Sequence, residues 1–292
     1  MKQFTYKKIN AFSTKGSQGN PAACVYLDTE EDLTELEMLN IAKEHKGFVS
    51  EVIYCWQLDN HLYRLRYYSS ECEVEFCGHG TIACIYDLIY NDEYLKSLEE
   101  ITIRTNKGDL KVYNELGTLD AVFITAPEPE YMATSIPCDE IAGNLKIKED
   151  VLNRVHPVML IDAGLRTLIV PIGNLTDIIN IHPDESELKE FCLINNIDIV
   201  LVFTTEVADR NNSARTRVFA PRFGYLEDPA TGSGNSAFGY YMMKQNLWDG
   251  NIISIEQNAE MDNYNVVKLK TKGNRVLFGG NAVVKIEGNY FL

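Results

Sequence analysis

Several features that would assign a function at once are missing from this sequence. None of its seven cysteines lies in a Cys-x-x-Cys pair, which argues against a zinc ribbon or a thioredoxin-type site. No apolar run approaches the ~20 residues of a membrane-spanning helix. The N-terminal segment has no apolar stretch long enough for a signal peptide, and the Gly-x-Ser-x-Gly motif of serine hydrolases is absent. These absences predict a cytoplasmic protein with reduced cysteines and no membrane partner.

Positive charge is also scarce. The 292 residues include 27 Lys and Arg against 42 Asp and Glu, which gives a formal net charge of −15. Such a chain is repelled by nucleic-acid backbones and by anionic membranes, so we expect neither as a partner. A small anionic substrate needs only a local positive field. Metal-ligand spacing is absent from His45, His61, His156 and His182, so no metal is predicted.

Short strand-like runs dominate the chain, and helices are few. Turn signals such as Asn106–Asp109 separate the runs. Helices are predicted over 34–44, where Thr34 and Glu37 form a capping-box pattern, and over 81–90, 185–194 and 237–246. The strands are predicted over 22–27, 49–56, 62–68, 101–105, 110–113, 120–125, 158–161, 167–171, 198–203, 216–219, 252–256, 266–270 and 283–286. The class is α+β, with antiparallel sheets because the connections look too short for parallel crossovers.

One short pattern occurs twice in the sequence. Cys77-Gly78-His79-Gly80 and Thr231-Gly232-Ser233-Gly234 each open a Gly-x-Gly-x-x-Ala segment before a predicted helix. The repeat predicts two related lobes, with a boundary in the proline-punctuated segment 127–137. We expect an N-terminal lobe of residues 1–128 plus a returning C-terminal strand at about 282–292. Residues 129–281 would form the second lobe.

The glycine pattern admits more than one interpretation. It is also a dinucleotide fingerprint, but the helix–strand alternation of a Rossmann domain does not follow either copy. Unpaired backbone N–H groups at a helix N-terminus attract anions, and glycine allows a close approach. Two such helix ends could hold a carboxylate. The plain alternative is that both copies are tight strand-to-helix turns.

Four blocks of the sequence together resemble the PhzF-like (phenazine-biosynthesis-like) proteins. They are NAF with GNPAA (10–23), AKE with SE (42–51), EVEFCGHGT (73–81) and RVFAP with EDPATGS (217–233). The resemblance implies the diaminopimelate-epimerase-like fold, in which two pseudo-symmetric lobes each curl an antiparallel, barrel-like sheet around a central helix. It also implies an active site at the lobe interface, no metal or organic cofactor, and usually a homodimer.

The family's activity sets the expected roles. The characterised reaction is an isomerisation, which moves a proton between carbons of a small, cyclic, unsaturated amino-hydroxy acid. By the matching motifs, Glu51 is the acid/base, and His79 and Asp228 position the substrate and its protons. The carboxylate of the substrate would bind at the two helix starts, through Gly78, Gly80, Gly232, Ser233 and Gly234.

Each of these residues also has a plainer interpretation. Glu51 precedes the apolar run Val52–Tyr54, so burial would raise its pKa and suit proton transfer, but it could equally be a surface residue of an edge strand. His79 could help to cap a helix. Asp228, which precedes a proline, could form an Asx turn, and Ser233 could be a helix N-cap.

Two further functions stay open. Thiol-dependent epimerases of the same fold use two opposed cysteines, and Cys77 occupies the first such position. The repeat places Thr231 at the second, and a hydroxyl is far too weak an acid to replace a thiol there. Cys77 could still serve as the single base of a dehydratase or epimerase, although a buried, inert cysteine is the simpler expectation. The last alternative is a non-enzymatic ligand-binding or interaction protein.

Overall fold

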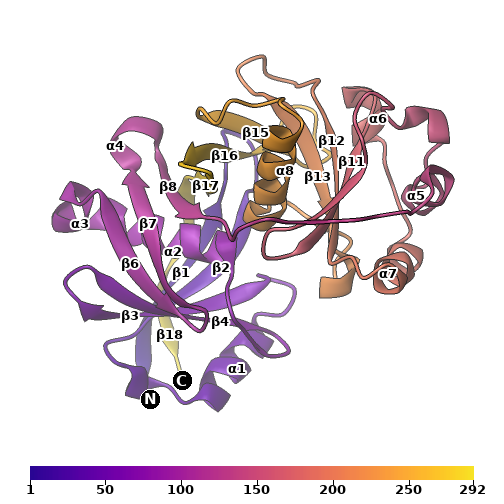
Figure 1. Ribbon diagram of the computed structural model, residues 1–292. Coiled ribbons are helices and arrows are strands. Elements are labelled where there is room, and N and C mark those ends of the chain that lie inside the picture. Colours follow the sequence, from indigo (N-terminus) through magenta and orange to yellow (C-terminus); the bar gives the residue numbers. More distant parts are fainter. The chain divides into compact units, whose positions relative to one another are not determined.

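The computed structural model describes all 292 residues, which form two compact units (Figure 1). Unit 1 contains Met1–Ser13, Gln18–Thr125 and Gly279–Leu292. Unit 2 contains Thr14–Ser17 and Ala126–Phe278. No helix in either unit is long and apolar enough to span a membrane. The location of an active site between two lobes stays a prediction.

Unit 1 is built on one mixed sheet. Hydrogen bonding gives the strand order β18–β1–β2–β3–β4–β6–β7–β8, with the short β5 paired to β4. The strands are β1 (Gln3–Ala11), β2 (Asn20–Tyr26), β3 (Glu51–Asp59), β4 (Leu62–Ser69), β5 (Glu73–Val74), β6 (Glu100–Thr105), β7 (Gly108–Glu115), β8 (Ala121–Thr125) and β18 (Ala282–Phe291).

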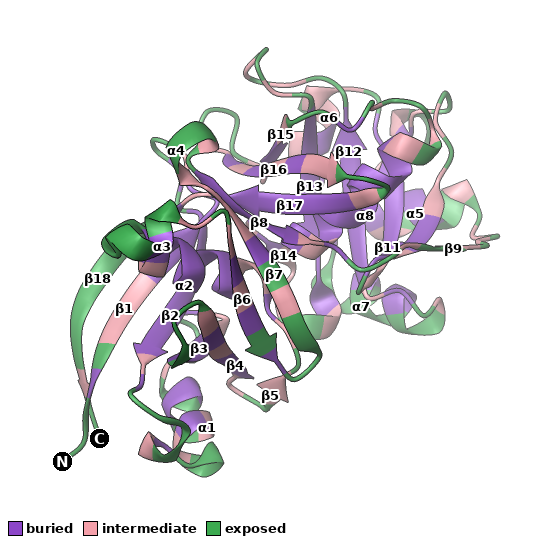
Figure 2. Cartoon of the chain, turned by 60° about the vertical axis from the view of Figure 1, so that its left-hand side comes forward, coloured by how far each residue is buried: buried purple, intermediate pink, exposed green.

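Helix α2 (Gly78–Asn91) is the centre of unit 1. All of its residues from Gly80 to Asp87 are buried (Figure 2). The helix contacts strands at both ends of the sheet order, β18 and β8, which means that the sheet curls around it. A sheet wrapped around one apolar helix therefore confirms the curled architecture expected from the resemblance.

Helix α1 (Glu35–Glu44) covers the other face of this sheet. The Thr34 side chain accepts from the Glu37 N–H while the Glu37 carboxylate accepts from the Thr34 N–H, so the predicted capping box is confirmed. Met38 and Ile41 pack with Tyr54 and other strand residues into one apolar cluster. Short helices α3 (Glu93–Ser97) and α4 (Leu116–Leu119) complete the unit.

Unit 2 repeats this design. Its sheet has the order β9–β10–β11–β12–β13–β15–β16, with the short β14 paired to β13. Its strands are β9 (Glu130–Met132), β10 (Met159–Asp162), β11 (Arg166–Pro171), β12 (Ile199–Thr204), β13 (Ala214–Phe219), β14 (Glu227–Asp228), β15 (Ile253–Gln257), β16 (Asn265–Lys272) and β17 (Arg275–Gly280). The buried helix α8 (Gly232–Lys244) contacts β10, β11, β12 and β16.

Three helices pack on the other face of the unit 2 sheet. They are α5 (Cys138–Leu145), α6 (Leu175–Ile179) and α7 (Glu185–Ile194). Buried side chains such as Ile141, Leu188 and Phe191 share one core cluster with Leu168 and Val200 of the strands. The predicted helix 185–194 is thus confirmed, whereas α8 begins five residues before the predicted start at Ala237 because Gly232 and Gly234 are helical.

The expectation that all strand pairs are antiparallel is wrong in detail. Each unit has two parallel pairs, β2–β3 and β4–β6 in unit 1 and β11–β12 and β13–β15 in unit 2. The connections are long enough because each contains a helix, which carries the chain back across the sheet. From β10 to β16, the pairing sequence of unit 2 therefore matches that of unit 1 from β1 to β7, strand by strand.

Candidate active site

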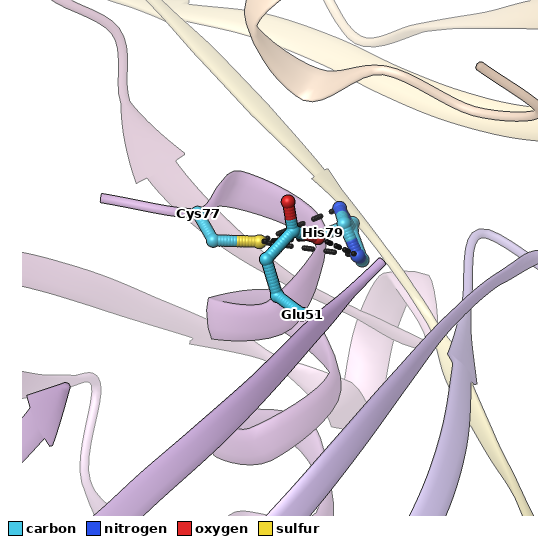
Figure 3. Close-up of side chains that lie close together, drawn as sticks. All are labelled: Glu51, Cys77 and His79. Carbon is cyan, nitrogen blue, oxygen red and sulfur yellow. Dashed lines mark hydrogen bonds and ion pairs between the residues drawn. The ribbon is translucent and has the colours of Figure 1, made fainter. Parts of the chain in front are cut away.

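Three side chains of unit 1 meet at the start of α2 (Figure 3). Glu51 is the first residue of β3, Cys77 is the N-cap of α2, and His79 lies in the first turn of the helix. The Nε2 atom of His79 is 3.3 Å from Oε2 of Glu51. The Cys77 Sγ atom is 3.7 Å from the same carboxylate oxygen and 3.5 Å from Nδ1 of His79. Strand β3 and helix α2 thus bring two of the predicted catalytic residues into contact, together with the alternative base.

The backbone around Cys77 is held by several hydrogen bonds. Its carbonyl accepts from the N–H and the hydroxyl of Thr81, and its Sγ accepts from the Gly80 N–H at 3.4 Å. Glycine is required at position 80, because a Cβ there would lie 2.6 Å from the Ile53 side chain on β3. The helix therefore starts in close contact with the strand that carries Glu51.

The environment of His79 keeps the imidazole neutral. Its side chain is only 12% exposed, and burial lowers the pKa of His79 to about 4, although a hydrogen bond to the Pro21 carbonyl opposes this shift. At neutral pH the ring therefore carries one N–H and one lone pair. The contact with Glu51 is then not an ion pair with an imidazolium, and the Glu51 side chain remains 17% exposed.

The predicted residues of unit 2 lie at the start of α8. Asp228 ends β14, is buried, and accepts a hydrogen bond from the Thr231 hydroxyl at 2.5 Å. Buried Gln257 joins this pair, since its Nε2 donates to the Asp228 carbonyl and to the Thr231 hydroxyl. Its Oε1 accepts from the Thr231 N–H and from Nδ2 of Asn235. The Asp228 carboxylate is thus held by the Thr231 hydroxyl, while the Gln257 amide holds the Asp228 backbone carbonyl and Thr231.

The structure at the start of α8 also corrects the alternative interpretation of Ser233. The N-cap is Thr231, so the interpretation of Ser233 as N-cap is wrong. Ser233 itself is half-buried. The backbone N–H groups of Gly232, Ser233 and Gly234 lie in the first turn, where the helix itself offers no acceptor, and the N-cap side chain accepts from none of them. A Cβ at Gly232 would lie 2.4 Å from the Phe278 ring, so this glycine too is required by packing.

Sequence reasoning missed part of both sites. Gln257 and Asn235 carry no local signal, because an amide in a strand or a helix is usually a surface residue. It also missed that the internal repeat extends beyond the Gly-x-Gly segment on its N-terminal side. Arg66 on β4 holds Glu73 with two hydrogen bonds, and Arg217 on β13 holds Glu227 in the same way. The repeat therefore begins four residues before Cys77 and Thr231, at the two glutamates.

The sequence profile of the phenazine biosynthesis-like proteins (PhzC-PhzF) matches residues 9–288. The chain belongs to this family. Among curated family relatives, Antisense-enhancing sequence 1 of Schizosaccharomyces pombe is 29% identical, with full coverage of both chains. The uncharacterized isomerase YfhB of Bacillus subtilis is 27% identical over 99% of this chain and 96% of its own. The names of several relatives support the predicted isomerase.

Solved structures agree with the family fold. A Bacillus anthracis phenazine biosynthesis protein of the PhzF family superimposes with a TM-score of 0.84 at 26% identity, with full coverage of both chains. A hydroxyproline epimerase from Agrobacterium vitis gives a TM-score of 0.60 at 11% identity, over 99% of this chain and 91% of its own. The predicted fold class is confirmed.

Proposed function

We propose that this protein is a cofactor-independent isomerase that moves a proton between carbons of a small carboxylic acid, with Glu51 as the acid/base. Glu51 takes a proton from one carbon, the electron pair of the broken C–H bond shifts along the substrate, and Glu51 returns the proton to another carbon on the same face. The observation that carries the proposal is the 3.3 Å contact between the Glu51 carboxylate and a neutral His79. General acid–base catalysis needs such a positioned carboxylate.

The substrate class follows from the helix starts. The N–H groups of Gly78 and His79 at α2, and those of residues 232–234 at α8, lie in the first turns of their helices, where no carbonyl of the helix accepts from them. Such N–H groups bind anions, and the carboxylate of a small acid is the simplest match. The chain is also acidic overall, with a net charge of −15, so a local site must attract the anion. The homodimer and the cytoplasmic location stay predictions.

One residue favours a second candidate function. Cys77 is buried at the N-terminus of α2, where its sulfur accepts from the Gly80 N–H and lies 3.7 Å from Oε2 of Glu51. Its sulfur could act as the single base of a dehydratase or an epimerase. A two-base mechanism with Thr231 is not supported, because that hydroxyl donates to Asp228.

Proton exchange in heavy water tests the proposal. The protein is incubated with a panel of small cyclic and acyclic amino and hydroxy acids, and deuterium uptake is followed by mass spectrometry. We expect Glu51→Gln to lower the exchange rate by about 10²- to 10⁴-fold, the usual contribution of a general base. The matched control is Glu71→Gln, which changes an exposed glutamate of the same unit.

The thiol variant separates the two candidates. Cys77→Ala should retain exchange if Glu51 is the base. Exchange that survives in Glu51→Gln but disappears in Cys77→Ala would overturn the proposal in favour of thiol chemistry. No uptake with any compound of the panel would favour a ligand-binding protein instead.

A further inference from the structure

The cluster at the start of α2 combines three different metal-binding groups. A carboxylate oxygen of Glu51, the thiol sulfur of Cys77 and an imidazole nitrogen of His79 all lie within 4.8 Å of one another (Figure 3). Zinc is bound in proteins by these three ligand types. Thiolate and imidazole together select it over Mg²⁺ or Ca²⁺, which prefer oxygen. The chemistry of the cluster is therefore that of a soft divalent cation site.

The spacing of the atoms also fits a tetrahedral ion. Zinc lies about 2.0–2.2 Å from nitrogen and oxygen ligands and about 2.3 Å from sulfur, so neighbouring ligands are about 3.4 Å apart, or about 3.6 Å where one is sulfur. The distances here are 3.3 Å from Nε2 of His79 to Oε2 of Glu51, and 3.7 Å from Sγ of Cys77 to the same oxygen. Sγ lies 3.5 Å and 3.8 Å from the two ring nitrogens. The three groups thus span one face of a tetrahedron with small side-chain shifts.

We propose that Glu51, Cys77 and His79 form a reversible Zn²⁺ site whose occupation blocks proton transfer. The blocking part rests on the proposed function, because a zinc ion bound to the Glu51 carboxylate occupies the oxygen that takes the proton of the substrate. The side chains of Glu51 and His79 are both partly exposed to solvent, so an ion can reach them. The fourth coordination position of the zinc ion would be taken by water or by a substrate carboxylate.

Cobalt(II) provides a readout that does not depend on activity. Co²⁺ replaces Zn²⁺ in such sites, and a thiolate ligand gives a sulfur-to-cobalt charge-transfer band. We expect this band in the wild-type protein, with one Co²⁺ per chain displaced by ZnCl₂. Cys77→Ser should abolish the band, while its hydroxyl can still accept from the Gly80 N–H and keep the helix start intact. His79→Asn and Glu51→Gln should each weaken Zn²⁺ binding at least about tenfold.

The control uses another cysteine of the same unit. Cys72 is exposed and lies outside the cluster, so Cys72→Ser should leave the band unchanged. Absence of the band in the wild-type protein would overturn the proposal. Its survival in Cys77→Ser would also overturn it, and would point to the buried cysteines Cys24, Cys55 and Cys84.

Inhibition is measured separately. ZnCl₂ should abolish proton exchange, and a chelator should restore it. If no compound of the panel exchanges protons, the proposed function fails, while the cobalt spectrum still decides whether the metal site exists. If the wild-type protein binds zinc at these residues but exchange continues at the full rate, the blocking role is wrong.

Discussion

The starts of α2 and α8 share a backbone but differ in their side chains. In unit 1 the N-cap residue is Cys77, whose sulfur accepts the Gly80 N–H. In unit 2 the N-cap is Thr231, whose hydroxyl donates to Asp228 and accepts from no N–H of the helix start. Unit 1 thus places proton-handling groups at its helix start, whereas unit 2 presents an uncapped, anion-attracting one. The two helix starts therefore share one backbone arrangement, and a few side chains give each of them a different chemical role.

The carboxylates near the two helix starts, Glu51 and Asp228, also differ between the units, because they come from positions that are not equivalent. Tyr67 on β4 and Val218 on β13 are equivalent by their pairing with β5 and β14, so their partners Ile53 on β3 and Leu201 on β12 are equivalent too. By that equivalence Glu51 in unit 1 matches Ile199 in unit 2, which is buried. In the opposite direction, Asp228 matches Val74 on β5, because both pair with the equivalent residues of β4 and β13. Each unit therefore has one carboxylate near its helix start, from different positions.

The largest predicted effect on proton exchange concerns the two carboxylates, Glu51 in unit 1 and Asp228 in unit 2. The Asp228 carboxylate accepts from the Thr231 hydroxyl, and Gln257 holds the Asp228 backbone carbonyl, so we expect Asp228 to position the substrate rather than to carry the proton. Asp228→Asn should lower proton exchange by about tenfold, much less than Glu51→Gln. The two variants are compared in the heavy-water assay with the same compounds. Equal losses would mean that both carboxylates transfer protons, and the comparison between the two helix starts would fail.

The next effect concerns the glycines that let both helices approach their sheets. Gly80→Ala and Gly232→Ala place a Cβ at 2.6 Å from Ile53 and 2.4 Å from Phe278, respectively. Overpacking of this kind should lower the free energy of unfolding by about 1–3 kcal/mol in each variant. Urea unfolding followed by circular dichroism measures the loss.

The matched control is Gly143→Ala in α5. No atom lies within 4 Å of a Cβ at that helical position, so the variant should keep or slightly raise the stability. A loss at Gly143 equal to that at Gly80 would show that packing is not the cause.

The sequence predicts local features better than contacts between distant residues. The capping box of Thr34 and Glu37 was predictable because both partners lie within one turn. The glycine repeat likewise indicated where α2 and α8 begin. The contact of His79 with Glu51 was not derivable from spacing, because it depends on how α2 packs against β3. The role of each residue came from the resemblance to a family.

The same limit explains what was missed. Strand β1 was not predicted because its residues alternate weakly between apolar and polar types, and its pairing with β2 and β18 decides its structure. Gln257 was missed because only the fold places it beside Asp228. The parallel pairs were excluded because the helices inside the crossovers were not recognised as connections.

The smallest predicted effect tests the Arg–Glu pair that the two units share. Hydrogen bonds from Arg66 lower the pKa of Glu73 below its usual value of 4.5, so the pair stabilises the fold above that pH. The stabilisation disappears as the pH falls through the lowered pKa of the folded state. Glu73→Gln should therefore cost about 1–2 kcal/mol at pH 7, and the gap to the wild type should close in acid.

Unit 2 provides the comparison for this prediction. The Arg217 side chain is 3% exposed against 9% for Arg66, and it also donates to the carbonyls of Ile178, Ile179 and Ile181. Removal of its partner leaves a more deeply buried cation, so Glu227→Gln should cost at least as much as Glu73→Gln. Glu71→Gln, which breaks an exposed pair with Lys46, should leave the stability almost unchanged, because solvent screens such pairs. Equal effects of all three variants in urea unfolding would show that these duplicated pairs contribute no more than surface charges.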